Sequence, residues 1–238
     1  MSDWSIRRLS RVQEVTGAQR YLEVGVYHAS TFHAVPFPEK DAVDVYFPFD
    51  TQAYASAEVR FHQMTSDAFF VSGQAREPYD VIYLDGLHTF EQTFRDFVAT
   101  LSLAHADTVW LIDDTMPSDV YSAIADPELS IAERHRAGLP GDLWHGDVYK
   151  VVLAIHDFCP NVNFATIVDN GNPQTLVWRE PRADFRPAFS GLEAISRVSY
   201  FDRQRCADAF HYCTEQEALD RWQHWYAKRC DEAVEVFV

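Results

Sequence analysis

Short apolar runs alternate with amphipathic stretches along the first half of the chain. One amphipathic stretch, residues 89–105, places Phe90, Phe94, Phe97 and Leu101 at helical spacing. The last two apolar runs are almost continuous, which is typical of central parallel strands. This alternation predicts an α/β fold in which helices flank a parallel sheet. The expected strands are residues 21–24, 42–46, 59–63, 79–84 and 108–112, after a leading helix at 5–19.

The second half of the chain has a looser pattern. Residues 147–158 predict a helix, and residues 117–141 contain a further helical stretch. Two late strands, 163–168 and 175–178, are separated by the turn sequence D-N-G-N-P. Because strands joined so closely favour antiparallel pairing, we expect a hairpin at one edge of the sheet.

The last part of the chain differs from the rest. Residues 181–191 predict a linker, and a helical segment at 204–229 carries an aromatic stripe. Such a stripe usually packs against a core or another subunit. We therefore divide the chain into a ligand-binding domain, 1–180, and a C-terminal helical extension, 181–238, that serves as packing, as a cap or as a homo-oligomer contact.

The loop after the first strand is a candidate site, because ligands of parallel sheets bind beyond the carboxyl ends of the strands. Gly25 lets the backbone turn sharply, and Glu23 is placed to hold a cationic amino group. Ser30 is suited to cap the next helix. Only one glycine is present, with Ala29 where a second is common, so the phosphate-binding G-x-G-x-x-G pattern is absent. An ordinary strand–helix turn is the alternative.

Acidic residues also follow the second and third strands. Asp44 lies about 20 residues after Gly25, where a carboxylate commonly accepts hydrogen bonds from a ribose diol. Asp50 competes for that role. After the third strand, Asp67 is within reach of an adenine amino group. Ser66 either lies beside the adenine or is the N-cap of a short helix.

The fourth and fifth strands end abruptly in carboxylates, Asp85 and then Asp113 and Asp114. Neighbouring strands lie about 4.8 Å apart, so these side chains are expected to converge, and they repel one another unless a cation or protons intervene. Mg²⁺ prefers such oxygen ligands and lowers the pKa of a bound hydroxyl. His88 is the expected base. The alternative is that the aspartates cap segments and that His88 orients a loop.

A further polar cluster contains His145, Asp147 and Lys150. Lys150 is expected to stabilise an anionic intermediate. His145, Asp147 and, on the first loop, His28 are candidate substrate contacts. For Asp147 the alternative is a cap on the helix that follows it.

Composition narrows the classes of partner. The formal net charge of −16 disfavours nucleic acid and anionic lipid, because both are bound through Lys and Arg. Neither the first residues nor any later run is apolar enough for a signal peptide or a membrane span. The four cysteines have no zinc-type spacing. We expect a cytoplasmic protein with free thiols that acts on a small molecule.

Three segments carry a resemblance to a known family: Y-L-E-V-G-V-Y-H-A-S-T-F, D-G-L-H-T-F-E-Q and I-D-D-T. Over roughly residues 18–180 the chain resembles class I S-adenosylmethionine-dependent methyltransferases of the Methyltransf_24 type. The resemblance implies a Rossmann-like, mostly parallel seven-stranded sheet with an antiparallel last strand. It implies S-adenosylmethionine as methyl donor, with Glu23 and Gly25 at its methionine part, Asp44 at the ribose and Asp67 at the adenine.

The same resemblance implies Mg²⁺ at Asp85, Asp113 and Asp114, and a histidine base, His88, as in members that modify sugars of natural products. We add further cofactor contacts from the loop positions: Tyr27, Ser30, Ser66 and Asp85.

The expected activity is O-methylation of a hydroxyl on a small molecule or sugar-containing natural product, with Asp85, His88 and Lys150 as catalytic residues. A metal-independent carboxyl- or N-methyltransferase is one alternative, because a carboxylate needs no base. A non-catalytic protein that retains the cofactor fold is another. The single-glycine loop argues against a nucleotide-binding oxidoreductase.

Overall fold

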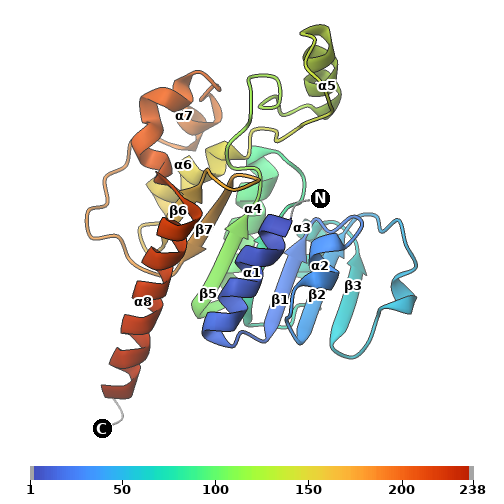
Figure 1. Cartoon of the computed structure of the whole chain (residues 1–238), viewed down its shortest axis with the longest axis vertical. Coiled ribbons are helices and arrows are strands. Elements are labelled where there is room, and N and C mark those ends of the chain that lie inside the picture. Colours follow the sequence, from blue (N-terminus) through green and yellow to red (C-terminus); the bar gives the residue numbers. More distant parts are fainter. Residues whose placement is uncertain (1–2, 236–238) are drawn as a thin grey trace.

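A single mixed sheet forms the centre of the molecule. Its strands are β1 (Arg20–Val24), β2 (Glu39–Asp44), β3 (Val59–Gln63), β4 (Tyr79–Leu84), β5 (Ala104–Ile112), β6 (Asn163–Ile167), β7 (Gln174–Trp178) and β8 (Tyr212–Cys213). In this computed structural model, which describes residues 3–235, the strand order is β3-β2-β1-β4-β5-β7-β6-β8 (Figure 1). Strands β1 to β5 pair in parallel, whereas β7 lies antiparallel between β5 and β6.

The predicted parallel sheet and the antiparallel hairpin are confirmed, and β3 and β4 have the predicted bounds. Two details were wrong. The reversed strand β7 is internal, and the sheet has an eighth strand inside the segment expected to be helical. His211 turns the chain at a positive φ of 50°, which brings β8 alongside β6. The backbone of β8 then pairs there, with the amide of Val168 donating to the carbonyl of Cys213 at 3.1 Å.

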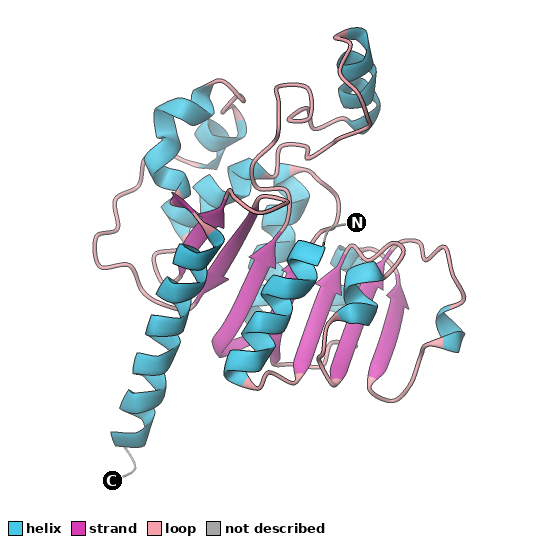
Figure 2. Ribbon diagram, viewed as in Figure 1, coloured by secondary structure: helices cyan, strands magenta, loops and turns pink. Residues whose placement is uncertain are grey.

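Helices cover both faces of the sheet (Figure 2). One face packs against α1 (Asp3–Thr16), α2 (Ser30–Ala34) and α8 (Glu215–Glu235), through side chains such as Phe32 and Trp222. The opposite face packs against α3 (Ser66–Val71), α4 (Phe90–Thr100), α6 (Tyr149–Phe158) and α7 (Leu192–Ser196). The remaining helices are α5 (Pro127–Arg136) and the 3-10 turns η1 (Thr51–Ala53), η2 (Leu101–Leu103) and η3 (Asp202–Phe210). The layers agree with the expected α/β class.

The C-terminal extension contributes to both layers. Phe210 of η3 is fully buried in the cluster with α4 and α6, and Trp222 of α8 is fully buried in the cluster with α1. Arg8 of α1 pairs with Glu215 at the start of α8, 2.8 Å between Nε and Oε2. The aromatic side chains predicted to form a packing stripe therefore include two that lie in the core of the same chain. Over residues 3–235, every helix is too short or too polar to cross a membrane.

Candidate functional site

A pocket of about 610 Å³ opens at the carboxyl ends of β1, β2 and β4. All eight residues predicted to contact the cofactor line it, as do His28 and His88. Those eight are Glu23, Gly25, Tyr27, Ser30, Asp44, Ser66, Asp67 and Asp85. These residues are spread over more than 60 positions of sequence, and the parallel strands bring them to one rim.

The backbone conformation and the packing of the chain require glycine at position 25. Its φ is +85°, and a Cβ there would collide with the backbone of Asp85 and Gly86. A Cβ at this position would point at the loop after β4, while the backbone of Gly25 lines the pocket, as predicted for a residue next to a ligand. Tyr27 and Ala29 also have positive φ values, 45° and 58°, which explains why glycines would suit these positions.

Glu23 is a buried acid at the inner end of the pocket. It is 2% exposed, and the hydroxyl of Tyr21 donates to its Oε2 at 2.6 Å. Burial raises the pKa of Glu23 well above its ordinary value, and the charge of Asp85 adds to the rise, against the hydrogen bond from Tyr21. A cation that binds next to a buried carboxyl group strongly stabilises the ionised form of that group. Glu23 therefore fits the ammonium group of an amino acid.

Asp44 fastens the first loop to β2. Its Oδ2 accepts hydrogen bonds from the amides of Val26 and Tyr27, at 2.7 and 2.8 Å. Its Oδ1 accepts from the amide of Tyr46 at 3.0 Å. Asp50, the competing acid, caps η1 and does not line the pocket. Since Oδ2 already accepts twice and Oδ1 only once, Oδ1 keeps a lone pair that can accept from a diol hydroxyl.

The start of α3 forms the outer wall of the pocket. Thr65, not Ser66, is the N-cap: its hydroxyl accepts from the amide of Ala68 at 3.2 Å. Ser66 instead accepts a hydrogen bond from Gln92 at 3.2 Å, and Asp67 pairs with Arg95 of α4 at 2.7 Å.

Sequence reasoning missed several pocket residues. Gln92 and Asp96, one turn apart on α4, both line the pocket, and Gln92 donates to Asp96 at 2.9 Å. Their spacing on the polar side of the predicted helix was the available signal. Met64 and Thr65 also line the pocket, directly after β3.

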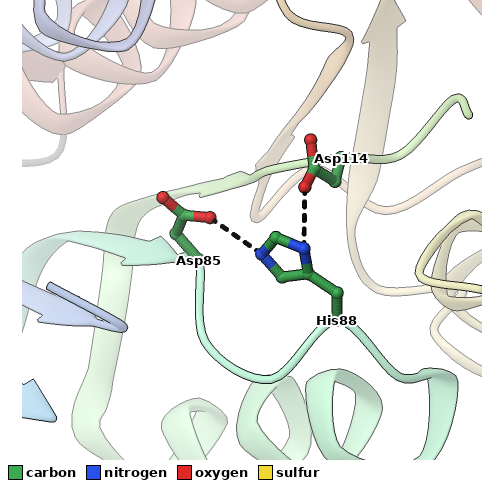
Figure 3. A group of neighbouring side chains, drawn as sticks. All are labelled: Asp85, His88 and Asp114. Carbon is green, nitrogen blue, oxygen red and sulfur yellow. Dashed lines mark ion pairs between the residues drawn. The ribbon is translucent and has the colours of Figure 1, made fainter. Parts of the chain in front are cut away.

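Asp85, His88 and Asp114 form a compact group (Figure 3). Asp85 and His88 of this group line the pocket. The ring of His88 lies between the two carboxylates, with Nε2 3.4 Å from Asp85 Oδ1 and Nδ1 3.0 Å from Asp114 Oδ2. Burial lowers the pKa of His88, but the hydrogen bonds and charges of Asp114 and Asp85 outweigh burial and raise it to about 11. This rise favours the protonated ring of His88, which contacts both carboxylates.

Asp113 lies outside this group, contrary to the prediction that it is a metal ligand. Tyr83 donates to its Oδ2 at 2.7 Å, and Asn172 and Gln174 donate to its Oδ1 at 2.6 and 3.0 Å. Burial raises the pKa of Asp113 well above its ordinary value, and Asp85 and Asp114 add to the rise. Asp113 thus holds the loop before β7 against β5.

The predicted cluster at residues 145–150 separates into different roles. Asp147 caps α4, not α6, because its Oδ1 accepts from the amide of Phe90 at 2.8 Å. Lys150 donates to Asp147 at 2.8 Å and to the carbonyl of Ser196 at 2.7 Å, so it is a structural contact away from the pocket lining. His145 is 5% exposed and its Nε2 lies 3.8 Å from Asp114 Oδ1.

A divalent cation fits the donors of the compact group. Asp85, His88 and Asp114 each offer one ligand atom, and these atoms lie within 4.8 Å of one another. Carboxylate and imidazole donors suit divalent ions. A cation there would replace the positive charge that the protonated ring of His88 now supplies.

Comparisons with known proteins agree with this fold. Residues 4–115 match the family model for a methyltransferase domain, Methyltransf_24, and no curated protein matches the chain. Among solved structures, the O-methyltransferase TomG from Streptomyces achromogenes, involved in tomaymycin synthesis and bound to SAM, is 14% identical with a TM-score of 0.52, over 76% of this chain and 81% of that chain.

Two further structures show the same likeness. Cofactor-bound Rv0187 from MTB is 16% identical with a TM-score of 0.54, over 76% of this chain and 82% of that chain. SAH-bound PaMTH1 from Podospora anserina is 13% identical with a TM-score of 0.53, over 76% and 80% of the two chains. At these identities the likeness concerns the fold. Residues 4–115, a little under half of the chain, resemble the methyltransferase domain of the Methyltransf_24 model, and the fold is similar to that of these cofactor-bound proteins.

Proposed function

We propose that the protein transfers the methyl group of S-adenosylmethionine to a hydroxyl oxygen of a small molecule, assisted by a divalent cation such as Mg²⁺. One observation carries the proposal: Asp85 and His88 line the same pocket as the residues proposed to bind the cofactor, and both lie next to Asp114. A methyl group delivered through this pocket would arrive beside an acid–base group. The fold shared with TomG, an O-methyltransferase of tomaymycin synthesis, supports a hydroxylated or sugar-containing natural product as the acceptor.

The cofactor residues have distinct roles in this proposal. Glu23 holds the ammonium group, and Asp44 accepts hydrogen bonds from the ribose hydroxyls. Ser66, Asp67 and Gln92 lie on the wall that would face the adenine. Bound there, S-adenosylmethionine supplies an activated sulfonium methyl, so the protein need only align the acceptor and exclude water.

His88 receives the proton that the reaction releases. The acceptor oxygen bonds to the methyl carbon as the carbon–sulfur bond breaks, and the hydroxyl proton passes to Nε2, the ring nitrogen that faces Asp85 in the pocket. His88 can act in this way only when its own proton has left. A divalent cation at Asp85 and Asp114 would neutralise the charge that retains that proton.

The same charge balance favours a second candidate function. Because the protonated His88 already pairs with both Asp85 and Asp114, the group holds one positive charge with no other cation. A metal-independent transfer to a carboxylate or amine would need no base at His88, only orientation of the acceptor.

Calorimetry with S-adenosylhomocysteine tests the cofactor pocket. We expect wild type to bind it, and Glu23→Gln to weaken binding by about tenfold or more, because a charged hydrogen bond contributes about 1.5–3 kcal/mol. Glu14→Gln, at an exposed site on α1, is the matched control. Equal affinities of Glu23→Gln and wild type would contradict the assignment of Glu23.

Mass spectrometry of a panel of hydroxylated, carboxylated and amine acceptors tests the reaction. The proposal expects a methylated hydroxyl product that EDTA abolishes and Mg²⁺ restores. Methylation of carboxylates or amines that is insensitive to EDTA would establish the second candidate instead.

A further inference from the structure

The turn before β7, with the sequence D-N-G-N-P, carries a side chain that reaches the compact group of Asp85, His88 and Asp114. This side chain is Asn172. Its amide nitrogen, Nδ2, lies 2.6 Å from Asp113 Oδ1 and 2.8 Å from Asp114 Oδ1. An amide nitrogen carries two hydrogens, so Asn172 donates one to each of the two acids. The turn therefore does more than connect β6 to β7.

The two oxygens of Asp114 have different partners. Oδ1 accepts the hydrogen bond from Asn172, whereas Oδ2 lies 3.0 Å from Nδ1 of His88. Asp114 also has a φ of 57°, which is uncommon for a residue other than glycine and persists only where the surrounding contacts hold it. The hydrogen bond from Asn172 does not involve the oxygen that faces His88. It can therefore persist when a cation takes the place of the proton on His88.

The backbone on both sides of Asn172 is fixed to distant segments. Arg8 of α1 donates from Nη1 to the carbonyl of Asn172 at 2.8 Å. The carbonyl of the next residue, Pro173, accepts from the amide of Thr115 at 3.2 Å, directly after Asp114. The side chain of Asn172 is thus presented to the two acids from a turn that is held by α1 and by the segment after β5.

We propose that Asn172 is a positioning residue of the cation site, which holds the carboxylate of Asp114 by Oδ1 and thereby keeps Oδ2 on the side of His88. The inference rests on the metal part of the proposed function. The same amide also holds Asp113, so Asn172 fixes the different directions of two acids that are adjacent in sequence. Residues that hydrogen-bond to the ligands of a metal affect its affinity although they do not touch it.

Calorimetric titration of the full chain with Mn²⁺, which takes the same oxygen ligands as Mg²⁺, tests the assignment. Asn172→Leu removes the donor and nearly keeps the size of the side chain. It should weaken Mn²⁺ binding by about tenfold or more, as loss of such a partner commonly does. The affinity for S-adenosylhomocysteine should change by less than about threefold, because Asn172 is not part of the pocket lining.

The matched control lies in the same turn. Asn170 is exposed and donates to Asp169, not to the acids after β5. Its φ is 52°, a value that glycine adopts readily, so Asn170→Gly should change neither affinity. A loss of Mn²⁺ affinity in this control as large as in Asn172→Leu would show that the effect comes from the turn as a whole, and would overturn the inference.

A double-mutant cycle separates positioning from general damage to the fold. In an Asp114→Asn background, Asn172→Leu should weaken Mn²⁺ binding by less than about threefold, because the two residues act through one contact. An undiminished effect in that background, or unchanged Mn²⁺ affinity in Asn172→Leu, would overturn the inference. Asn172→Ala removes the same donor and takes the place of Asn172→Leu if the leucine variant does not fold.

The outcome for wild type distinguishes this inference from the rest of the proposed function. Absence of any divalent binding to wild type would overturn the role of Asn172 together with the metal part of that function. Binding of S-adenosylhomocysteine would still report on the cofactor pocket.

Discussion

Gly146 lies directly against the backbone carbonyl of His88, and no side chain fits between them. The contact joins two loops that are far apart in sequence. The ring of His88 also stacks near that of Trp144, 4.9 Å between centroids, and its Nδ1 donates to the Trp144 carbonyl at 3.2 Å. The ring of His88 is thus oriented by the loop that follows β5 as well as by Asp85, three residues earlier in the chain.

Gly146→Ala is therefore expected to destabilise the protein more than a positive φ alone would. Gly138 has a similar φ of +75° but open space where its Cβ would lie, which makes Gly138→Ala the matched control. The control should cost about 1–2 kcal/mol from backbone strain. Gly146→Ala should lower the melting temperature in scanning calorimetry by at least about twice as much, because the collision with His88 adds to the strain. Equal shifts of the two variants would show that the loops can separate freely.

Asp113 and Asp114 are adjacent in sequence but are expected to differ in metal binding. Asp114→Asn should weaken binding of a divalent cation by about tenfold or more, since it removes a charged ligand. Asp113→Asn should change the affinity by less than about threefold, because burial raises the pKa of Asp113 and its oxygens already accept hydrogen bonds from Tyr83, Asn172 and Gln174. The measurement is calorimetric titration with Mg²⁺ or Co²⁺. A larger loss for Asp113→Asn would restore Asp113 as the ligand.

The residues that line the pocket could be predicted from the sequence because their signals are local. Each apolar run of the parallel sheet ends at a turn or an acid, and all such ends meet at one rim. Glu23, Asp44 and Asp85 follow this rule, and all three line the pocket. The bounds of β3 and β4 could be predicted correctly for the same reason.

The acid group could be predicted only in part, because its final form depends on distant residues. Asp114 turns toward His88 at a φ of 57°, while Asp113 turns toward Gln174, which lies 61 residues further along the chain. The I-D-D-T segment alone does not predict the direction in which either side chain points. The hydrogen bond from Lys150 to the carbonyl of Ser196 could not be predicted for the same reason, because that carbonyl belongs to the extension after residue 180.

Substitution of Arg8 tests how much the C-terminal extension contributes to the stability of the fold. It is 1% exposed and donates to Glu215 at 2.8 Å, to Gln174 at 2.7 Å and to backbone carbonyls of the loop before β7. Arg8→Met would remove a buried cation and leave the side chain of Gln174 and the carbonyl of Asn172 without this donor, while Arg7 would still pair with Glu215. Breaking a buried ion pair commonly costs about 3–5 kcal/mol, and we expect the lower end of that range. Urea unfolding followed by circular dichroism measures the loss.

The matched control for that variant lies on the same helix. Arg11 forms an exposed pair with Glu14 at 3.3 Å, so Arg11→Met should cost less than about 1 kcal/mol. If Arg8→Met cost no more than this control, α8 would contribute little to the stability of the sheet, and residues 181–238 would behave as a separate unit.

His211 is expected to make the stability of the protein depend on pH. Its ring stacks on Phe164 with centroids 4.4 Å apart. Burial lowers the pKa of His211 to about 4, and the nearby charges of Arg221, His156 and Arg182 lower it further. The hydrogen bond to the Phe164 carbonyl acts in the opposite direction. The unfolded chain, with an ordinary histidine pKa of about 6.5, therefore binds the proton first as pH falls. The contribution of His211 is complete above about pH 6.5 and is lost progressively toward pH 4.

Urea unfolding at several pH values between 7.5 and 4.5 should thus give a shallower decline for His211→Asn than for wild type. Asparagine tolerates the positive φ of 50° at this position and does not titrate. His211 can contribute at most about 1.4 kcal/mol per pH unit to the slope, so the comparison of slopes, not of absolute stabilities, is informative. His135→Asn, at an exposed histidine of α5, should keep the wild-type slope. Parallel curves for wild type and His211→Asn would mean that the ring is protonated without cost in the folded state, and that its stacking on Phe164 does not exclude water.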